Sequence, residues 1–211
     1  AKDWMAQLVQ KSEKGGADRP IWAIDRGVNI CRALSLPPAH LIGDRDSAAH
    51  DAWAWAEEHG ARVHAFPPAK DFTDTELALR IAAELMPHAL VILTGAFGGR
   101  FDHLMSAASV AAHAALPCIL ADEREALFFL HGDESLTITC DSPPQAISLL
   151  PFTEECTGIT TNGLRWELNG AQIHTHSSTT ISNVLAESNT EHRFSVTLGS
   201  GILGVYLCHK E

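Results

Sequence analysis

Three short acidic segments carry the residues best suited to chemistry in this chain of 211 residues. They read Gly43-Asp44-Arg45-Asp46-Ser47, Lys70-Asp71-Phe72-Thr73-Asp74 and Gly98-Gly99-Arg100-Phe101-Asp102-His103. Magnesium prefers oxygen ligands and bridges one or two carboxylates to substrate phosphates. Glycine lets the backbone approach a ligand closely, and arginine adds a forked positive charge that suits phosphate. Together the three segments predict a magnesium and polyphosphate site.

Taken singly, each segment has a structural explanation. Asp44 and Asp46 suit a solvated turn, and Asp71 and Asp74 suit the first turn of a helix, where the helix dipole favours carboxylates. The glycine-rich turn before Arg100 also serves close packing of a helix on a strand. All three segments, however, fall at the ends of predicted strands, which is where ligands bind in open parallel sheets. Their conjunction favours a binding site over coincidence.

Composition narrows the class of protein. A net charge of −11 argues against nucleic acid or an anionic membrane surface as partner. Five cysteines, odd in number and without a Cys-x-x-Cys pair, predict reduced thiols in a cytoplasmic protein. No apolar run approaches the ~18 residues of a membrane span, and the start of the chain lacks the pattern of a signal peptide. We therefore expect a soluble, cytoplasmic protein.

The first half of the chain alternates strands and helices. After a helix at 4–14, apolar strands are predicted at 21–24, 40–42, 63–66, 89–94 and 118–121, with helices at 28–34, 47–59, 75–85 and from 100 to about 115. Ser47 is expected to cap the helix at 47–59. The alternation predicts an α/β domain with a parallel, Rossmann-like sheet over residues 1–124.

Past Asp122 the pattern changes to short strands. They are predicted at 126–130, 135–139, 146–150, 158–161, 164–168, 172–176, 194–198 and 203–208, rich in β-branched or aromatic residues and separated by turn residues. This pattern predicts an all-β sandwich domain over residues 125–211. His174 and His176 would share one face of a strand as a metal pair, but without a third ligand surface histidines are the better interpretation.

The acidic segments resemble motifs of the thiamine pyrophosphokinase family. Residues 42–47 are similar to its Gly-Asp-x-Asp-Ser segment, residues 70–76 to its Asp-x-Thr-Asp segment, and residues 98–103 to its Gly-Gly-Arg-x-Asp-His segment. In the second half, residues 158–166 resemble its Thr-x-Gly-Leu-x-Trp stretch and residues 181–183 its Ser-Asn thiamine-pocket stretch. The resemblance covers roughly residues 21–207.

One departure from the family pattern lies in the first acidic turn. The family commonly has Ala-Asp-Gly-Gly there, whereas this chain has Ile24-Asp25-Arg26-Gly27. Arg26 therefore stands where a glycine is usual, and we expect it to contact the nucleotide.

The resemblance implies an enzyme that transfers pyrophosphate from ATP to the hydroxyl of thiamine, giving thiamine diphosphate and AMP. It implies that residues 1–124 bind ATP and magnesium and residues 125–211 bind thiamine. It also implies a homodimer, with the β domain of one subunit facing the α/β domain of the other at the thiamine site. Two alternatives stay open, namely a non-catalytic thiamine or thiamine diphosphate binding protein and a magnesium-dependent nucleotide hydrolase. The intact carboxylates argue against a pure binder.

The resemblance also implies residue roles. The catalytic set is Asp44, Asp46, Asp74, Arg100 and Asp102, with Asp44, Asp46 and Asp74 as magnesium ligands. Arg100 is expected to stabilise phosphates, and Asp102 to bind metal or orient the hydroxyl. The nucleotide-binding set is Asp25, Arg26, Lys70, Asp71, Thr73, Gly95, Gly99 and His103. The thiamine-binding set is Trp166, Ser182 and Asn183, in which Trp166 offers an aromatic face to the cationic thiazolium or the pyrimidine, while a core position remains open for it.

Overall fold

The computed structural model describes Trp4, Leu8 and residues 19–43, 48–66 and 71–209. The predicted helix at 4–14 and the predicted site residues Asp44, Asp46 and Lys70 lie largely or wholly outside the described residues. The chain divides into two compact units, Ala1–Ala89 and Leu90–Glu211. No helix in the described ranges has the length and apolar character that a membrane span requires.

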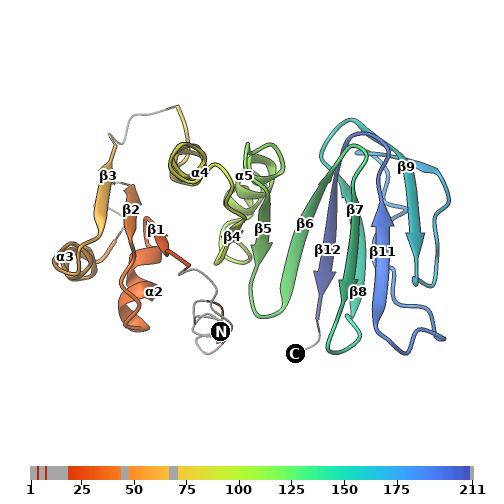
Figure 1. Cartoon of the computed structure of the whole chain (residues 1–211), viewed down its shortest axis with the longest axis horizontal. Helices are drawn as coiled ribbons and strands as arrows, with labels where there is room; N and C mark the ends of the chain where they lie inside the picture. Colours follow the sequence, from red (N-terminus) through yellow and green to blue (C-terminus); the bar gives the residue numbers. More distant parts are fainter. Residues whose placement is uncertain (1–3, 5–7, 9–18, 44–47, 67–70, 210–211) are drawn as a thin grey trace. The chain divides into compact units, whose positions relative to one another are not determined.

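The first unit contains a parallel sheet of three strands in the order β1-β2-β3 (Figure 1). The strands are β1 (Trp22–Ile24), β2 (His40–Gly43) and β3 (Arg62–Ala65), and the helices are α2 (Gly27–Ala33), α3 (His50–Glu58) and α4 (Asp74–Leu85). Val28 of α2 and Trp53 of α3 pack with Ala23 and Leu41 of the sheet in one apolar core. This arrangement confirms the predicted alternation of strands and helices.

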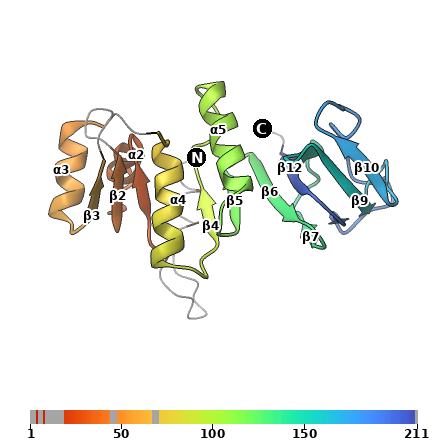
Figure 2. The ribbon, with the colours of Figure 1, turned by 90° about the horizontal axis from the view of Figure 1, so that it is seen from above.

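The second unit contains a mixed sheet of five strands in the order β4-β5-β6-β12-β8. The strands are β4 (Val91–Leu93), β5 (Cys118–Ala121), β6 (Glu125–His131), β8 (Ala146–Pro151) and β12 (Ile202–Cys208). β4 and β5 are parallel, and the other pairs are antiparallel. Helix α5 (Phe101–Ala112) follows β4 and lies alongside β4 and β5 (Figure 2).

A second, antiparallel sheet of this unit has the order β10-β9-β11-β7. Its strands are β7 (Ser135–Thr139), β9 (Glu155–Asn162), β10 (Ala171–His174) and β11 (Arg193–Thr197). Ile147 and Val205 of the mixed sheet share one core with Ile159, Phe194 and Val196 of this one. The chain as a whole therefore has a mixed α/β fold with parallel and antiparallel sheets.

The division into compact units differs from the predicted boundary after residue 124. Asp122 closes a tight turn there, because its Oδ1 accepts hydrogen bonds from the backbone N–H groups of Arg124 (2.8 Å) and Glu125 (2.9 Å). β6 consequently folds back antiparallel onto β5, and the sheet continues across the predicted boundary. The compact units part after Ala89, and the predicted division of binding roles between residues 1–124 and 125–211 stays a prediction.

Two local predictions were wrong. Residues 164–168 do not form a strand; Leu164 makes an isolated antiparallel bridge with Leu185, flanked by hydrogen bonds from Arg165 N to Val184 O and from Ala186 N to Gly163 O. The N-cap of α3 is Ala49 rather than Ser47, and it makes no side-chain cap. Oδ1 of Asn29 in α2 accepts the N–H of Ala49 at 3.1 Å, so a tertiary contact replaces the expected local cap.

Candidate functional site

Asp25 lies at the carboxyl end of β1 and reaches the end of the neighbouring strand. Its φ of 46° is in the left-handed region, which few residues other than glycine and asparagine or aspartate adopt. Its N–H donates to the carbonyl of Ile42 at 3.0 Å. A Cβ placed on Gly43 would overlap Oδ1 of Asp25 and lie 3.2 Å from its Cγ. The missing side chain at Gly43 therefore makes room for the Asp25 carboxylate directly before the Asp44 segment.

The second acidic segment begins helix α4. Oγ1 of Thr73 accepts the N–H of Glu76 at 3.2 Å, so Thr73 is the N-cap and Asp74 lies in the first turn. The guanidinium of Arg80 lies 4.0 Å from the centroid of the Phe72 ring and binds Glu76 at 2.8 Å. These contacts account for Thr73 as a structural residue; its predicted nucleotide contact stays a prediction.

The glycine-rich loop after β4 has an open backbone. Gly95, Gly98 and Gly99 have φ values of 73°, 94° and 75°, which favour glycine. A Cβ on any of the three would meet nothing within 4 Å. Backbone conformation rather than crowding therefore explains the glycines, and the space beside them is free for an approaching ligand.

Arg100 and Asp102 form a forked ion pair at the start of α5. Nε of Arg100 donates to Oδ1 of Asp102 at 3.0 Å, and Nη2 donates to Oδ2. Oδ1 of Asp102 also accepts the N–H of His103 at 3.0 Å. The hydrogen bonds from Arg100 hold the pKa of the Asp102 carboxyl below its ordinary value, so the group is a carboxylate at neutral pH. Both side chains are mostly exposed, so solvent and ligands compete with the pair.

Asn183 holds the backbone of Trp166 rather than facing solvent. Its Nδ2 donates to the carbonyl of Trp166 at 2.7 Å, and its Oδ1 accepts the N–H groups of Trp166 (3.2 Å) and Val184 (2.9 Å). The Trp166 side chain is 58% exposed, and the guanidinium of Arg165 lies 5.2 Å from its ring centroid. The side chain of Asn183 thus fixes the loop that presents Trp166. The alternative prediction, that Trp166 is a core residue, is wrong.

The Ser182 segment is joined to the outer strand of the mixed sheet. Asn183 and Ile147 of β8 exchange backbone hydrogen bonds at 2.7 and 2.8 Å. The N–H of Ser182, whose φ is 62°, donates to Oγ of the buried Ser148 at 3.0 Å. The predicted thiamine segment and the glycine-rich loop are therefore both attached to one five-stranded sheet, the first at β8 and the second at β4.

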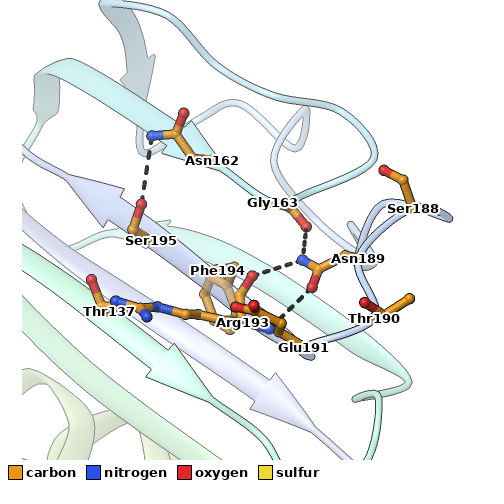
Figure 3. A pocket seen from close by; sticks show the side chains of 10 residues that line it. All are labelled: Thr137, Asn162, Gly163, Ser188, Asn189, Thr190, Glu191, Arg193, Phe194 and Ser195. Carbon is orange, nitrogen blue, oxygen red and sulfur yellow. Dashed lines mark hydrogen bonds between the residues drawn. The ribbon is translucent and has the colours of Figure 1, made fainter.

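A cavity of about 420 Å³ lies beside β11 and the loop before it (Figure 3). Asn189 closes one side, because its Nδ2 donates to the carbonyls of Gly163 (2.8 Å) and Arg193 (2.7 Å) and its Oδ1 accepts the N–H of Arg193. None of the predicted site residues lines this cavity. The side-chain amide of Asn189 is used to hold the loop, so we do not assign this cavity to ATP or to thiamine.

Among the described residues, no three histidine, cysteine or acidic side chains lie where they could hold a metal ion. The magnesium ligands predicted at Asp44 and Asp46 are outside that part of the chain, and Asp74 is within it. His174 and His176 stack with ring centroids 5.2 Å apart, and Nδ1 of His174 lies 3.9 Å from Oε2 of Glu155.

Comparison with known proteins decides the family. Residues 17–119 match the family model described as thiamin pyrophosphokinase, catalytic domain, and residues 135–203 match the one described as thiamin pyrophosphokinase, vitamin B1 binding domain. The chain belongs to the thiamine pyrophosphokinase family. It is similar to the thiamine pyrophosphokinase of Bacillus subtilis (strain 168), with 28% identity over 182 residues, or 84% of each chain.

Solved structures agree with this membership. The crystal structure of thiamine pyrophosphokinase from Bacillus subtilis superposes with a TM-score of 0.79 at 25% identity, covering 94% of this chain and 91% of that one. Thiamin pyrophosphokinase from Candida albicans superposes with a TM-score of 0.74 over 90% of this chain and 83% of that one, and its 16% identity shows the shared fold.

Sequence reasoning missed the role of Gly43. It stood in the recognised motif, yet only the positions of β1 and β2 show that it accommodates Asp25. The signal in the sequence was a glycine at a strand end directly before two aspartates.

Proposed function

We propose that this chain is an enzyme that transfers the pyrophosphoryl group of ATP to the hydroxyl of thiamine. The hydroxyl oxygen attacks the β-phosphorus, the bond from that phosphorus to the oxygen bridging the α-phosphorus breaks, and AMP leaves. The observation that carries this proposal is the match of the catalytic and vitamin B1 binding families to successive parts of one chain. The open glycine turn before Arg100 and the exposed Trp166 support it.

The carboxylates of the first unit are assigned to metal and phosphate. Asp44, Asp46 and Asp74 would hold magnesium, whose charge offsets that of the triphosphate. Asp25, fixed against Gly43, sets the position of the strand end that leads into Asp44. Arg26 is exposed and available to a nucleotide phosphate. Lys70 and Asp71, which precede α4 in the sequence, complete this set.

Arg100 is assigned to the triphosphate. Phosphoryl transfer depends chiefly on positioning and charge stabilisation, and a guanidinium offers five N–H donors in a fixed fork. Asp102 accepts hydrogen bonds from two of these donors and so holds the guanidinium directly after the glycine turn. Asp102 thus orients Arg100, while the backbone N–H groups of Gly95 to Gly99 and the side chain of His103 approach the phosphates.

Thiamine is assigned to the second unit. Trp166 presents an aromatic face, which attracts a cationic ring, and Ser182 and Asn183 lie in the segment bound to β8. We further propose a homodimer in which this surface completes the thiamine site, since Trp166 and Ile181 are exposed by 58% and 48%.

We also propose an assignment of the two parts of the chain to fold types and of the protein to a cellular compartment. The parallel strands are assigned to a Rossmann-like domain and the later sheets to a β-sandwich. Cytoplasmic location is supported by the cysteines, which are all free. Burial raises the pKa of the Cys31 and Cys118 thiols to about 11, so they stay protonated and unreactive.

The test is AMP release from MgATP with and without thiamine. We expect AMP and thiamine diphosphate to appear in equal amounts and only when thiamine is present. AMP or ADP release independent of thiamine would identify a nucleotide hydrolase. Thiamine binding without AMP release would identify a non-catalytic binding protein.

Replacing Arg100 with lysine is expected to lower kcat/KM for ATP by about 10- to 100-fold. Lysine keeps the charge but loses the forked contacts, and hydrogen bonds to charged groups contribute about 1.5–3 kcal/mol. Steady-state kinetics would measure this effect. Arg32→Lys is the control, because Arg32 pairs with Asp51 on the surface of the first unit. Equal kinetics for Arg100→Lys and the unsubstituted protein would assign the guanidinium to structure alone.

Replacing Asn183 with alanine is expected to weaken thiamine binding by about 5- to 100-fold while leaving ATP binding nearly unchanged. The substitution removes both side-chain bonds to the Trp166 backbone, and each such loss costs about 1–3 kcal/mol. Calorimetry with each substrate would test it. Asn189→Ala removes comparable backbone contacts, to Gly163 and Arg193 rather than to Trp166, and controls for general loss of stability. Weakened ATP binding with unchanged thiamine binding would contradict the assignment.

A further inference from the structure

Phe97 is the one large side chain in the glycine-rich loop between β4 and Arg100. The loop reads Gly95-Ala96-Phe97-Gly98-Gly99, so its neighbours supply backbone freedom and little packing. Ordering such a loop costs much conformational entropy. Phe97 is half-buried, and its ring contacts Tyr206 of β12 with centroids 6.4 Å apart and planes tilted by 55°. This geometry is that of an attractive aromatic pair.

Tyr206, the single tyrosine of the sequence, is itself held in place. Its hydroxyl donates to Oε1 of Glu125 at the start of β6, where the Asp122 turn binds the backbone N–H of Glu125. Burial, together with the Glu125 carboxylate, raises the pKa of Tyr206 above its ordinary value. The phenol therefore stays protonated at neutral pH and keeps its hydrogen bond.

The contact joins the loop after the edge strand β4 to the inner strand β12 of the mixed sheet. β5 and β6 lie between β4 and β12, so the contact joins the loop after β4 to a side chain of a strand that is not its neighbour in the sheet. Tyr206 stands opposite Ser148 of β8, whose Oγ accepts the N–H of Ser182 at 3.0 Å. Phe97 thus directs the loop toward the side of the sheet that carries the Ser182 segment.

We propose that Tyr206 is a positioning residue that, through Phe97, holds the Gly98-Gly99-Arg100 turn over the sheet in the conformation that receives the triphosphate of ATP. The inference deepens the proposed function and rests on it, because the ligand of the turn is ATP. The contact with Phe97 is one between rings, and the Tyr206 hydroxyl binds Glu125. Tyr206→Phe therefore keeps the contact, whereas Tyr206→Leu and Phe97→Leu remove it.

The first measurement is amide hydrogen exchange of residues 95–100 in the full chain without nucleotide. We expect Tyr206→Leu and Phe97→Leu each to speed exchange by about three- to tenfold, the range that the loss of an aromatic pair corresponds to. The double variant should exchange no faster than either single one, because both changes remove the same contact. Tyr206→Phe should stay within about twofold of the unsubstituted protein, since it keeps the ring pair.

Phe129→Leu is the matched control. Phe129 packs edge-on against Phe152 with centroids 5.2 Å apart, and it lies opposite Gly204 in the same sheet. The variant loses an aromatic pair of the same kind without touching the loop. It should lower the unfolding temperature and leave exchange at 95–100 unchanged. Equal acceleration by Phe129→Leu, or no acceleration by Tyr206→Leu, would overturn the proposal.

The second measurement is the affinity for MgATP and the kinetics. In Tyr206→Leu the KM for ATP should rise about three- to tenfold, with kcat and the KM for thiamine nearly unchanged. In Tyr206→Phe the KM for ATP should stay near that of the unsubstituted protein. A fall in kcat with an unchanged KM for ATP would overturn the positioning role. Faster exchange in Tyr206→Leu with no MgATP binding by the unsubstituted protein would overturn the proposed function while supporting the Phe97 contact.

Discussion

Replacing Gly43 with alanine is expected to lower kcat/KM for ATP by on the order of 100-fold, because displacement of site residues by about 1 Å has effects of this size. The added methyl group would overlap Oδ1 of Asp25, and the φ of Gly43, 128°, is unfavourable for any residue with a Cβ. Either Asp25 moves or the end of β2 moves. The end of β2 leads directly into Asp44, so both outcomes disturb the first acidic segment.

Gly60→Ala provides the matched control. Gly60 follows helix α3 with a φ of 87°, so alanine there also adopts a strained backbone, yet its Cβ would meet nothing within 4 Å. Both variants should lose about 1 kcal/mol or more of stability from strain, but only Gly43→Ala should lose activity. Thermal unfolding and steady-state AMP release measure the two effects. Normal kcat/KM in Gly43→Ala, or an equal loss in Gly60→Ala, would show that the contact with Asp25 does not serve the site.

Asp44→Asn and Asp46→Asn are each expected to reduce turnover by at least about 100-fold with little change in stability. Removing a residue that only orients a metal ligand costs about 10- to 100-fold, and loss of the ligand itself should cost at least as much. Asparagine keeps the volume and an oxygen but removes the negative charge that magnesium favours. Raising the magnesium concentration should recover part of the rate, because binding follows mass action.

Asp133→Asn is the control for a change of charge. Asp133 is exposed in the turn between β6 and β7 with a φ of 62°, which asparagine tolerates. The Asp133→Asn variant should retain full turnover at every magnesium concentration. Near-normal activity of Asp44→Asn or Asp46→Asn at saturating magnesium would remove that aspartate from the proposed metal site.

Local features of this chain could be predicted from its sequence because they depend on neighbouring residues. Apolar runs such as those of β1 and β2, separated by amphipathic helices, report directly on burial and gave the correct order of elements. Gly98 and Gly99 predicted a turn that other residues adopt with strain, and both have positive φ. The Gly-Gly-Arg and acidic motifs sufficed for the family, which the comparisons confirm.

Hydrogen-bond partners could not be predicted in the same way. The substrate contact of Asn183 stays a prediction, whereas the engagement of its amide by the backbone of Trp166 was not foreseen. An asparagine offers donors and acceptors to any backbone that packing brings near it, and the bridge between Leu164 and Leu185 decides which backbone that is. The sequence pattern marks the segment, and only the structure shows which backbone groups the Asn183 side chain holds.

The sequence by itself determined the family, the α/β alternation and the later run of short strands, because motif spacing and hydrophobic periodicity are properties of consecutive residues. Only the tertiary structure decided that β5 and β6 join parallel and antiparallel strands in one sheet, which moves the boundary between compact units to Ala89. It also decided that Gly43 receives Asp25 and that Phe97 meets Tyr206. Such contacts join residues that are distant in the chain, and they exist only once the strands have paired and fixed which side chains share a face.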